Sequence, residues 1–345
     1  MKVNRKLLCR ALEKVNHARD KGAGVVADEY VNFMLTHECV AGYNGTYLLY
    51  VPFELDIDPD IKIWSPPELL GMLKGMKEDT ITFSFSTDKK GSTIKLRSKM
   101  ERAKLNVQVD DNKPFKTPDK FKNLPKNFLE GLKMCQFSTS KNDPQLFLNC
   151  IGSIDNYLIS GDDTRFSRFE LSSKMQRCLI PSGYVPDILS FKPSKYVLDD
   201  HFLYLTNKKA EYIAMNLVND TYPKDLLNTF DLEDHVKIDL PEEMMGALED
   251  VSVVAGGDSD ISRWCDIKIT SKSIMCSCKN DKGEFDKKIS CMIDIDSSIE
   301  FSINPLLAIQ ILKKTQEVMV ADDRLMFVSD NFNHVMAYFN DTEEE

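Results

Sequence analysis

One short pattern occurs three times along the chain, at intervals of about 120 residues. Each copy is a hydrophobic residue, then a turn-prone stretch, then an apolar amphipathic run that closes on a leucine. The copies run from Trp64 to Leu73, from Ile180 to Leu189 and from Ile303 to Leu312. A β-rich stretch follows each copy, at residues 80–85, 201–205 and 324–328. A period this long indicates repeated domains rather than the shorter units of a solenoid.

A second pattern recurs at the same period. Near the start of each repeat, an amphipathic segment carries a small residue directly before a leucine: Ala11-Leu12, Gly131-Leu132 and Ala247-Leu248. Amphipathic helices resemble one another by chance, because apolar residues at i, i+3 and i+4 are common to all of them. Two patterns in the same order and at the same period nevertheless favour a triplicated domain.

The length of the chain agrees with this interpretation, since 345 residues suffice for two or three domains of ordinary size. We expect three domains, at residues 1–115, 124–225 and 236–340. A polar, proline-punctuated stretch at 110–120 forms the first predicted boundary. Each repeat reads helix, strands, helix, strands, which predicts an α+β fold with two helices packed on antiparallel sheet.

Composition places the chain among ordinary globular proteins, with 42% hydrophobic and 28% charged residues. No stretch approaches the roughly 18 apolar residues of a membrane span, and the first twelve residues lack the apolar core of a signal peptide. Nine scattered cysteines, an odd number, favour reduced thiols over a disulfide framework. We therefore expect a cytoplasmic protein without membrane contact.

The distribution of positive charge is more informative than the net charge of −10, which alone argues against a simple nucleic-acid binder. Basic residues recur on or beside equivalent predicted helices: Lys6, Arg10, Lys14, Lys74, Lys77, Lys126, Lys133, Lys192, Lys313 and Lys314. Taken singly, each is the solvated cation that any exposed helix carries. Their recurrence favours a DNA-binding face. The segment 242–250 departs from the pattern, because it carries four acidic residues.

Motifs of catalysis are absent from the sequence. The chain has no phosphate-binding loop, no His-Glu-x-x-His, no Gly-x-Ser-x-Gly and no dinucleotide glycine fingerprint. Cys265, Cys276, Cys278 and Cys291 lie close in sequence, but the Cys-x-x-Cys spacing of a zinc site is missing. We expect neither an enzyme nor a bound metal or cofactor.

Several segments together resemble one known family. They are the strand–turn–strand 273–292, the run from Phe301 to Lys313, the segment from Gly161 to Phe166 and the Tyr222-Pro223 pair. Their order is similar to that of the bacterial replicative sliding clamp, the β subunit of the DNA polymerase holoenzyme, or of a phage relative. The resemblance covers nearly the whole chain, with few identities.

The resemblance implies a mechanism and its partners. Two chains would close head to tail into a ring of six domains around double-stranded DNA, bound without regard to sequence through the lining cations. DNA polymerase and the clamp loader would bind by short linear motifs, in the cytoplasm of a bacterium or a phage-infected host. The implied peptide pocket consists of Thr164, Arg165, Phe166, Leu226, Leu227, Val335, Ala337 and Tyr338, and the implied ring interface of Leu105, Val107, Val253 and Val254.

Two alternatives remain at this point. One is a monomeric, non-ring DNA-binding accessory protein of replication or late transcription. The other is an enzyme whose site is assembled from scattered residues.

Overall fold

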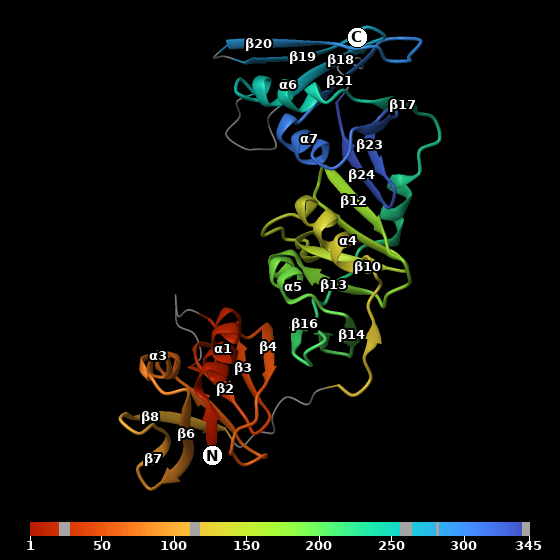
Figure 1. Cartoon of the computed structure of the whole chain (residues 1–345). Helices are drawn as coiled ribbons and strands as arrows, with labels where there is room; N and C mark the ends of the chain where they lie inside the picture. Colours follow the sequence, from red (N-terminus) through yellow and green to blue (C-terminus); the bar gives the residue numbers. More distant parts are fainter. Residues whose placement is uncertain (21–27, 111–117, 256–263, 281–282, 340–345) are drawn as a thin grey trace. The chain divides into compact units, whose positions relative to one another are not determined.

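The computed structural model describes residues 1–20, 28–110, 118–255, 264–280 and 283–339 (Figure 1). The chain forms two compact units. Unit 1 consists of Met1–Leu124 and Ser190–Leu217, and unit 2 of Pro125–Leu189 and Val218–Glu345. Within the described ranges no helix has the length and apolar character needed to cross a membrane.

Unit 1 is built on a twelve-stranded antiparallel sheet. In spatial order its strands are β1 (Lys2–Asn4), β6 (Thr80–Asp88), β7 (Gly91–Arg97), β8 (Arg102–Asp110), β5 (Lys62–Ser65), β2 (Phe33–Leu35), β3 (Cys39–Tyr43), β4 (Tyr47–Pro52), β16 (Tyr212–Asn216), β15 (Phe202–Thr206), β14 (Lys195–Leu198) and β9 (Lys122–Asn123). The β4–β16 pairing joins segments that lie far apart in sequence, with Tyr50 opposite Tyr212. These two rings stack with centroids 4.1 Å apart, in a core that also contains Met34 and Trp64.

Two helices of unit 1 pack together, α1 (Arg5–Val15) and α3 (Glu68–Gly75); a short helix, α2 (Asp28–Val31), precedes β2. Helix α1 begins where the Asn4 side chain accepts a hydrogen bond from the amide of Leu7 at 3.1 Å, a standard N-terminal cap. Its buried stripe includes Leu8, Leu12 and Val15. The periodicity seen in the sequence is therefore the burial pattern of the helix.

Unit 2 contains two further antiparallel sheets. The eight-stranded sheet has the order β13 (Cys178–Pro181), β10 (Cys150–Ile154), β11 (Tyr157–Gly161), β12 (Arg165–Glu170), β24 (Phe332–Ala337), β23 (Arg324–Ser329), β22 (Glu317–Val320) and β17 (Val236–Asp239). The four-stranded sheet has the order β20 (Gly283–Ser290), β19 (Ser273–Asn280), β18 (Cys265–Thr270) and β21 (Ile299–Ile303). The β12–β24 pairing makes one continuous sheet from two segments more than 160 residues apart, with Phe166 opposite Val335.

The helices of unit 2 are α4 (Phe128–Cys135), α6 (Glu243–Ser252) and α7 (Pro305–Leu312), and α5 (Val185–Phe191) ends just beyond its boundary. Helix α6 packs on α7. Helix α4 contacts β11 and β12, where a Cβ on Gly131 would come within 2.7 Å of the Phe169 ring. The small residue that precedes leucine in the second sequence pattern thus lets this helix approach the sheet closely.

Both repeated patterns correspond to equivalent elements. Each copy of the first is the end of a strand followed by a helix: β5 and α3, β13 and α5, β21 and α7. Each copy of the second lies in a helix, namely α1, α4 or α6. The strand–turn–strand predicted at 273–292 corresponds to β19 and β20, and β20 ends at Ser290. The stretch 111–117 and the acidic tail 341–345 lie outside the described residues, and the predicted domain bounds remain predictions.

Candidate nucleic-acid and peptide interfaces

The exposed face of α1 carries the cations that the sequence placed there, but two of the three are engaged. Lys6 pairs with Asp79 at 2.8 Å. Lys14 forms an ion pair with the largely buried carboxylate of Glu211, which also accepts from Asn207 at 2.7 Å. Arg10 is exposed, and no carboxylate lies within 4.0 Å of it among the described residues. Arg10 is therefore the cation of this helix that is most available to a phosphate.

The other predicted cations of unit 1 divide in the same way. Lys74 pairs with Glu13 at 2.8 Å, and that carboxylate raises the pKa of Lys74. Lys77 and Lys192 are exposed, and neither has an ion pair within the described part of the chain. Lys192 has φ = 53°, in the left-handed region, directly after the end of α5.

In unit 2, Lys126, Lys133 and Lys313 are exposed, and the described residues offer none of them a carboxylate partner. Lys314 differs, because its ammonium lies 4.8 Å from the centre of the Phe137 ring and 3.8 Å from the sulfur of Met134. Burial lowers the pKa of Lys314. The Lys314 ammonium is engaged by the Phe137 ring. Of the predicted DNA contacts, Lys314 is therefore the one least available to a phosphate.

Helix α6 exposes its acidic residues. Glu243, Glu249 and Asp250 face solvent, while Met244, Ala247 and Leu248 are buried. Asp250 pairs with Lys287 on β20 at 3.0 Å. A negatively charged helix face repels phosphate. The exposed face of α6 is therefore unsuited to DNA contact, in contrast to that of α1.

The predicted peptide pocket is assembled around Phe166. Its half-buried ring packs against two apolar clusters of unit 2, one containing Leu226 and Leu227 and the other containing Val335. We call Phe166, Leu226, Leu227, Leu232 and Val335 the Phe166 surface. A Cβ on Gly161 would collide with the Phe166 ring, so glycine at 161 leaves room for the ring. The structure therefore brings together the apolar members of the predicted pocket.

Arg165 has a structural position rather than an exposed one. It is 6% exposed, and its guanidinium donates to Asp162 at 2.9 Å, to Gln310 at 2.8 Å and to the Phe137 carbonyl at 2.9 Å. Asp162 also accepts from Thr164 Oγ1 at 2.8 Å. These contacts fix the turn before β12, so Arg165 and Thr164 position the backbone at Phe166.

The last two predicted pocket residues lie at the end of β24. The Ala337 amide donates to the Thr164 carbonyl at 2.9 Å, and Ala337 is exposed. The ring of Tyr338 lies 5.2 Å from that of Phe301, and its hydroxyl donates to the Ala321 carbonyl. Ala337 therefore adjoins the Phe166 surface through the sheet, whereas Tyr338 packs against β21.

Sequence reasoning missed Leu232 of this surface and Phe230, which is buried beneath it. Phe230 is buried beside Phe166, and the Arg168 guanidinium lies over its ring, 4.6 Å from the ring centre. It closes the 3-10 helix at Lys224–Phe230, and the spacing of Leu226, Leu227 and Phe230 is a one-turn apolar pattern. That spacing could have identified Phe230 as a contact of the same surface.

Strands β8 and β20 each have an unpaired edge in the described structure. β8 pairs with β5 only over Gln108–Asp110, so the same edge of residues 102–107 has no partner in the described structure. β20 pairs only with β19 and exposes all but one of its residues. Leu105 and Val107 are half-buried on β8. An unpaired edge is a template for pairing with another strand, and β8 provides one in unit 1 and β20 one in unit 2.

Val253 and Val254 follow the C-terminal end of α6. Val253 is 84% exposed, and the Val254 carbonyl accepts a hydrogen bond from the Asn280 side chain at the end of β19. Single exposed apolar side chains are common on protein surfaces, so this exposure does not by itself mark an interface.

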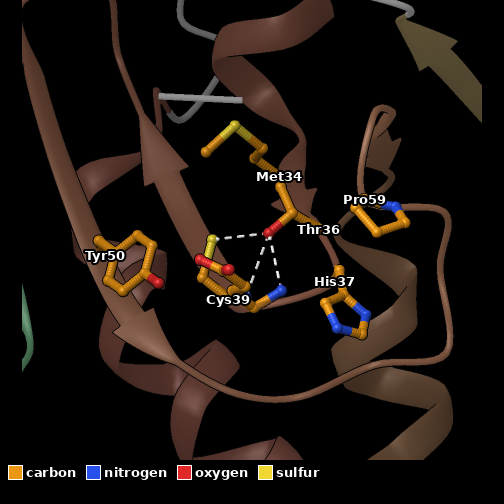
Figure 2. A pocket seen from close by; sticks show the side chains of 7 residues that line it. Met34, Thr36, His37, Cys39, Tyr50 and Pro59 are labelled. Carbon is orange, nitrogen blue, oxygen red and sulfur yellow. Dashed lines mark hydrogen bonds between the residues drawn. The ribbon is translucent and has the colours of Figure 1, made fainter. Parts of the chain in front are cut away.

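One cavity brings chemistry-bearing side chains together, a space of about 120 Å³ in unit 1 (Figure 2). Thr36, His37, Glu38, Cys39 and Tyr50 line it, with Met34 and Pro59. The Thr36 hydroxyl lies 3.2 Å from the sulfur of Cys39 and accepts from the Cys39 amide. Burial raises the pKa of the Cys39 thiol to about 12, so this thiol is not an activated nucleophile.

The remaining cysteines are similarly protected. Eight of the nine are buried, and only Cys291 is partly exposed. Burial raises the pKa of Cys135 to about 12 and of Cys178 to about 11. Within the described ranges no group of three or more potential ligand side chains is arranged to hold a metal ion.

Comparison with solved structures identifies the architecture. The DNA polymerase III subunit beta of Pseudomonas aeruginosa has a TM-score of 0.79 at 12% identity, covering 98% of this chain and 99% of that chain. The Caulobacter crescentus DNA polymerase sliding clamp has a TM-score of 0.80 at 13% identity, covering 98% and 99%. A Bartonella birtlesii sliding clamp bound to griselimycin has a TM-score of 0.77 at 16% identity, covering 99% of each chain.

Comparison by sequence finds no relative of the chain. No family model matches the chain, and no curated protein does so. The architecture is thus identified by structural similarity, which covers 98% of the chain. The chain has the α+β fold of the bacterial DNA sliding clamp.

Proposed function

We propose that this protein is a DNA polymerase processivity factor, a sliding clamp that encircles duplex DNA as a head-to-tail homodimer. The observation that carries the proposal is the structural match to bacterial clamps over 98–99% of the chain. A match to a single domain would suit many functions, because folds are reused. A match over the entire three-repeat arrangement supports the function that this arrangement serves.

The edges of β8 and β20 support the proposed ring. Each leaves a row of backbone groups unpaired, and pairing β8 of one copy with β20 of the other would satisfy both. Leu105, Val107, Val253 and Val254 would then be apolar contacts of the junction, as the resemblance implies. Two equivalent junctions would close two copies into a ring.

The helix cations support a weak, mobile association with DNA. Arg10, Lys133 and Lys313 are exposed and lack carboxylate partners in the described structure. Each neutralised phosphate adds about 0.9 to the slope of log affinity against log salt, so a few contacts give a strongly screened complex. We propose that enclosure rather than affinity keeps the clamp on DNA, and that weak contacts let it slide.

We propose that the Phe166 surface binds short linear motifs of DNA polymerase and of the clamp loader. A half-buried aromatic ring between aliphatic side chains is the chemistry that anchors an apolar peptide residue. The cavity beside Cys39 is a weaker candidate for a functional site, because burial raises the pKa of the Cys39 thiol. We accordingly propose a tether and not an enzyme.

Two measurements test the ring. Sedimentation should give a native mass near twice the 39.4 kDa chain mass. Protein loaded on a nicked circular plasmid should survive a high-salt wash and should be lost once the plasmid is linearised. A monomer that leaves both DNAs at the same rate would exclude enclosure and favour the non-ring accessory protein.

A further inference from the structure

A second basic surface lies on the sheet of unit 1, away from the helix cations. In β6, β7 and β8 the side chains alternate between two faces. One face is apolar and contains Ile81, Phe83, Ile94 and Leu96, all buried. The other carries Lys2, Lys95, Arg97, Arg102 and Lys104. We call these five residues the sheet cations.

The register aligns the sheet cations in rows across the strands. Lys2 of β1 lies opposite Thr82, Thr82 opposite Arg97, and Arg97 opposite Arg102. In the next row Ser84 lies opposite Lys95, which lies opposite Lys104. Two cross-strand pairs are therefore cation opposite cation, with Cβ atoms about 4.5–5.5 Å apart.

Such pairs are unfavourable without an anion. Like charges directly opposite one another destabilise a sheet, and among the described residues no carboxylate lies within 4.0 Å of any sheet cation. The nearest acidic positions on this face are Asp88 at the hairpin tip and Asp110, which pairs with Lys62 at 3.0 Å. The chain as a whole is acidic, with 44 basic and 54 acidic residues, so the sheet cations form a local positive patch on a negatively charged protein.

The neighbours of the sheet cations indicate the kind of anion. They are hydroxyl and amide side chains, namely Thr82, Ser84, Ser86, Thr93 and Asn106, and the described rows contain no aromatic or aliphatic residue. Peptides are recognised through apolar pockets or main-chain pairing, and single strands through aromatic platforms on which bases stack. Phosphate oxygens of a duplex need only cations and hydroxyl or amide donors.

We propose that the sheet cations bind the phosphate backbone of a nucleic-acid duplex, as a site separate from the helix faces. The proposal does not depend on the ring, because it concerns one face of one sheet. It gives the protein a second contact for duplex, on sheet rather than helix.

The test uses the full chain and a fluorescent 20-base-pair linear duplex, which cannot be retained by enclosure. The sheet variant carries Lys2→Gln, Lys95→Gln and Arg97→Gln, which leaves β8 and its proposed ring edge unchanged. The control carries Lys174→Gln, Lys208→Gln and Lys209→Gln, three exposed lysines with the same loss of charge. Affinity is measured by anisotropy from 50 to 200 mM KCl.

The sheet variant should bind about tenfold more weakly than the control at 50 mM KCl, with a salt slope reduced by about two to three. Lys95 and Lys104 of the unmodified protein should be protected from acetylation by the duplex, and Lys208 and Lys209 should not. Equal affinities and slopes for the two variants would overturn the proposal. So would a sheet variant that loses poly-L-glutamate binding but retains duplex binding, because the occupant would then be an acidic polypeptide.

Discussion

The guanidinium of Arg165 donates a hydrogen bond to Oε1 of Gln310 at 2.8 Å, joining the start of β12 to helix α7. The two residues are 145 positions apart in the sequence. This bond lies inside unit 2, beside the β12–β24 pairing that makes one sheet of two distant segments. The side chain that positions Phe166 therefore also secures a helix of the third repeat.

Arg165→Met should lower the free energy of unfolding by about 3 kcal/mol, because it leaves the Asp162 carboxylate and the Gln310 amide without their buried donor. Urea unfolding measures the loss. In a double-mutant cycle with Gln310→Met, the coupling should exceed about 0.5 kcal/mol. Additive effects would show that the bond joining β12 to α7 contributes nothing to stability.

Phe166→Ala should weaken binding of a short peptide carrying the linear motif of the cognate polymerase by at least about tenfold, because an aromatic anchor accounts for roughly 2 kcal/mol. Isothermal titration measures the change. The control is Leu146→Ala, which removes an apolar side chain that is 52% exposed in the same unit. Unchanged affinity in the Phe166 variant, with the fold intact, would move the peptide site elsewhere.

Removing the unpaired helix cations should reduce the salt dependence of duplex binding. In the variant Arg10→Gln, Lys133→Gln, Lys313→Gln, the slope should fall by up to about 2.7, or 0.9 for each lost phosphate contact. The measurement is the same anisotropy titration, with the Lys174, Lys208 and Lys209 variant as the control of equal charge. A slope equal to that of the control would remove these three residues from the DNA contact.

Introducing charge on the β8 edge should convert the proposed dimer to a monomer. Leu105→Glu with Val107→Glu places two carboxylates where we propose apolar contacts with a second copy, and burying them unpaired is costly. Sedimentation should then report 39.4 kDa. Val236→Glu, on the edge strand β17, is the matched control and should remain dimeric. If both variants stayed dimeric, β8 would not be part of the junction.

Acid should destabilise the protein through His334. Burial, with Arg165 and Lys314 nearby, lowers the pKa of His334 well below its ordinary value. The unfolded imidazole, with a pKa of about 6.5, therefore binds a proton that the folded one does not. The free energy of unfolding should be constant above about pH 7 and fall by up to about 1.4 kcal/mol per unit below about pH 6.

The matched variant for this pH effect is His334→Asn, which keeps a polar group near Ser167 Oγ, now 2.8 Å from Nδ1 of His334. Its urea-unfolding free energy should lose this pH dependence, whereas the slope from other groups should remain. Parallel pH profiles for the two proteins would show that His334 does not titrate on unfolding.

The helices could be predicted because the evidence for each is local. The buried stripe of α1 and the close approach at Gly131 are encoded within one or two helical turns. The bounds of the strands were harder to predict from the sequence. Residues 283–287 of β20, for example, are exposed and show little hydrophobic alternation. The edge position of β20 explains why, because only one side of an edge strand is constrained by a neighbour.

The site was predicted only in part, for a related reason. Arg10 and Lys6 look equivalent on one helix face, yet Lys6 is paired with a residue 73 positions away. Lys14 is paired with one 197 positions away. No local pattern distinguishes an engaged cation from an available one. Phe166 was found through resemblance, and Phe230 was missed although its spacing from Leu226 and Leu227 is that of one helical turn.

The burial of the cysteines makes the protein suited to optical measurement. Eight thiols are inside the fold, and Cys291, the ninth, is partly exposed. Thiolate availability and access govern reaction with maleimide dyes, so the native sequence offers one preferred attachment point. A fluorophore placed there would test the proposed sliding along DNA without a cysteine-free background having to be engineered first.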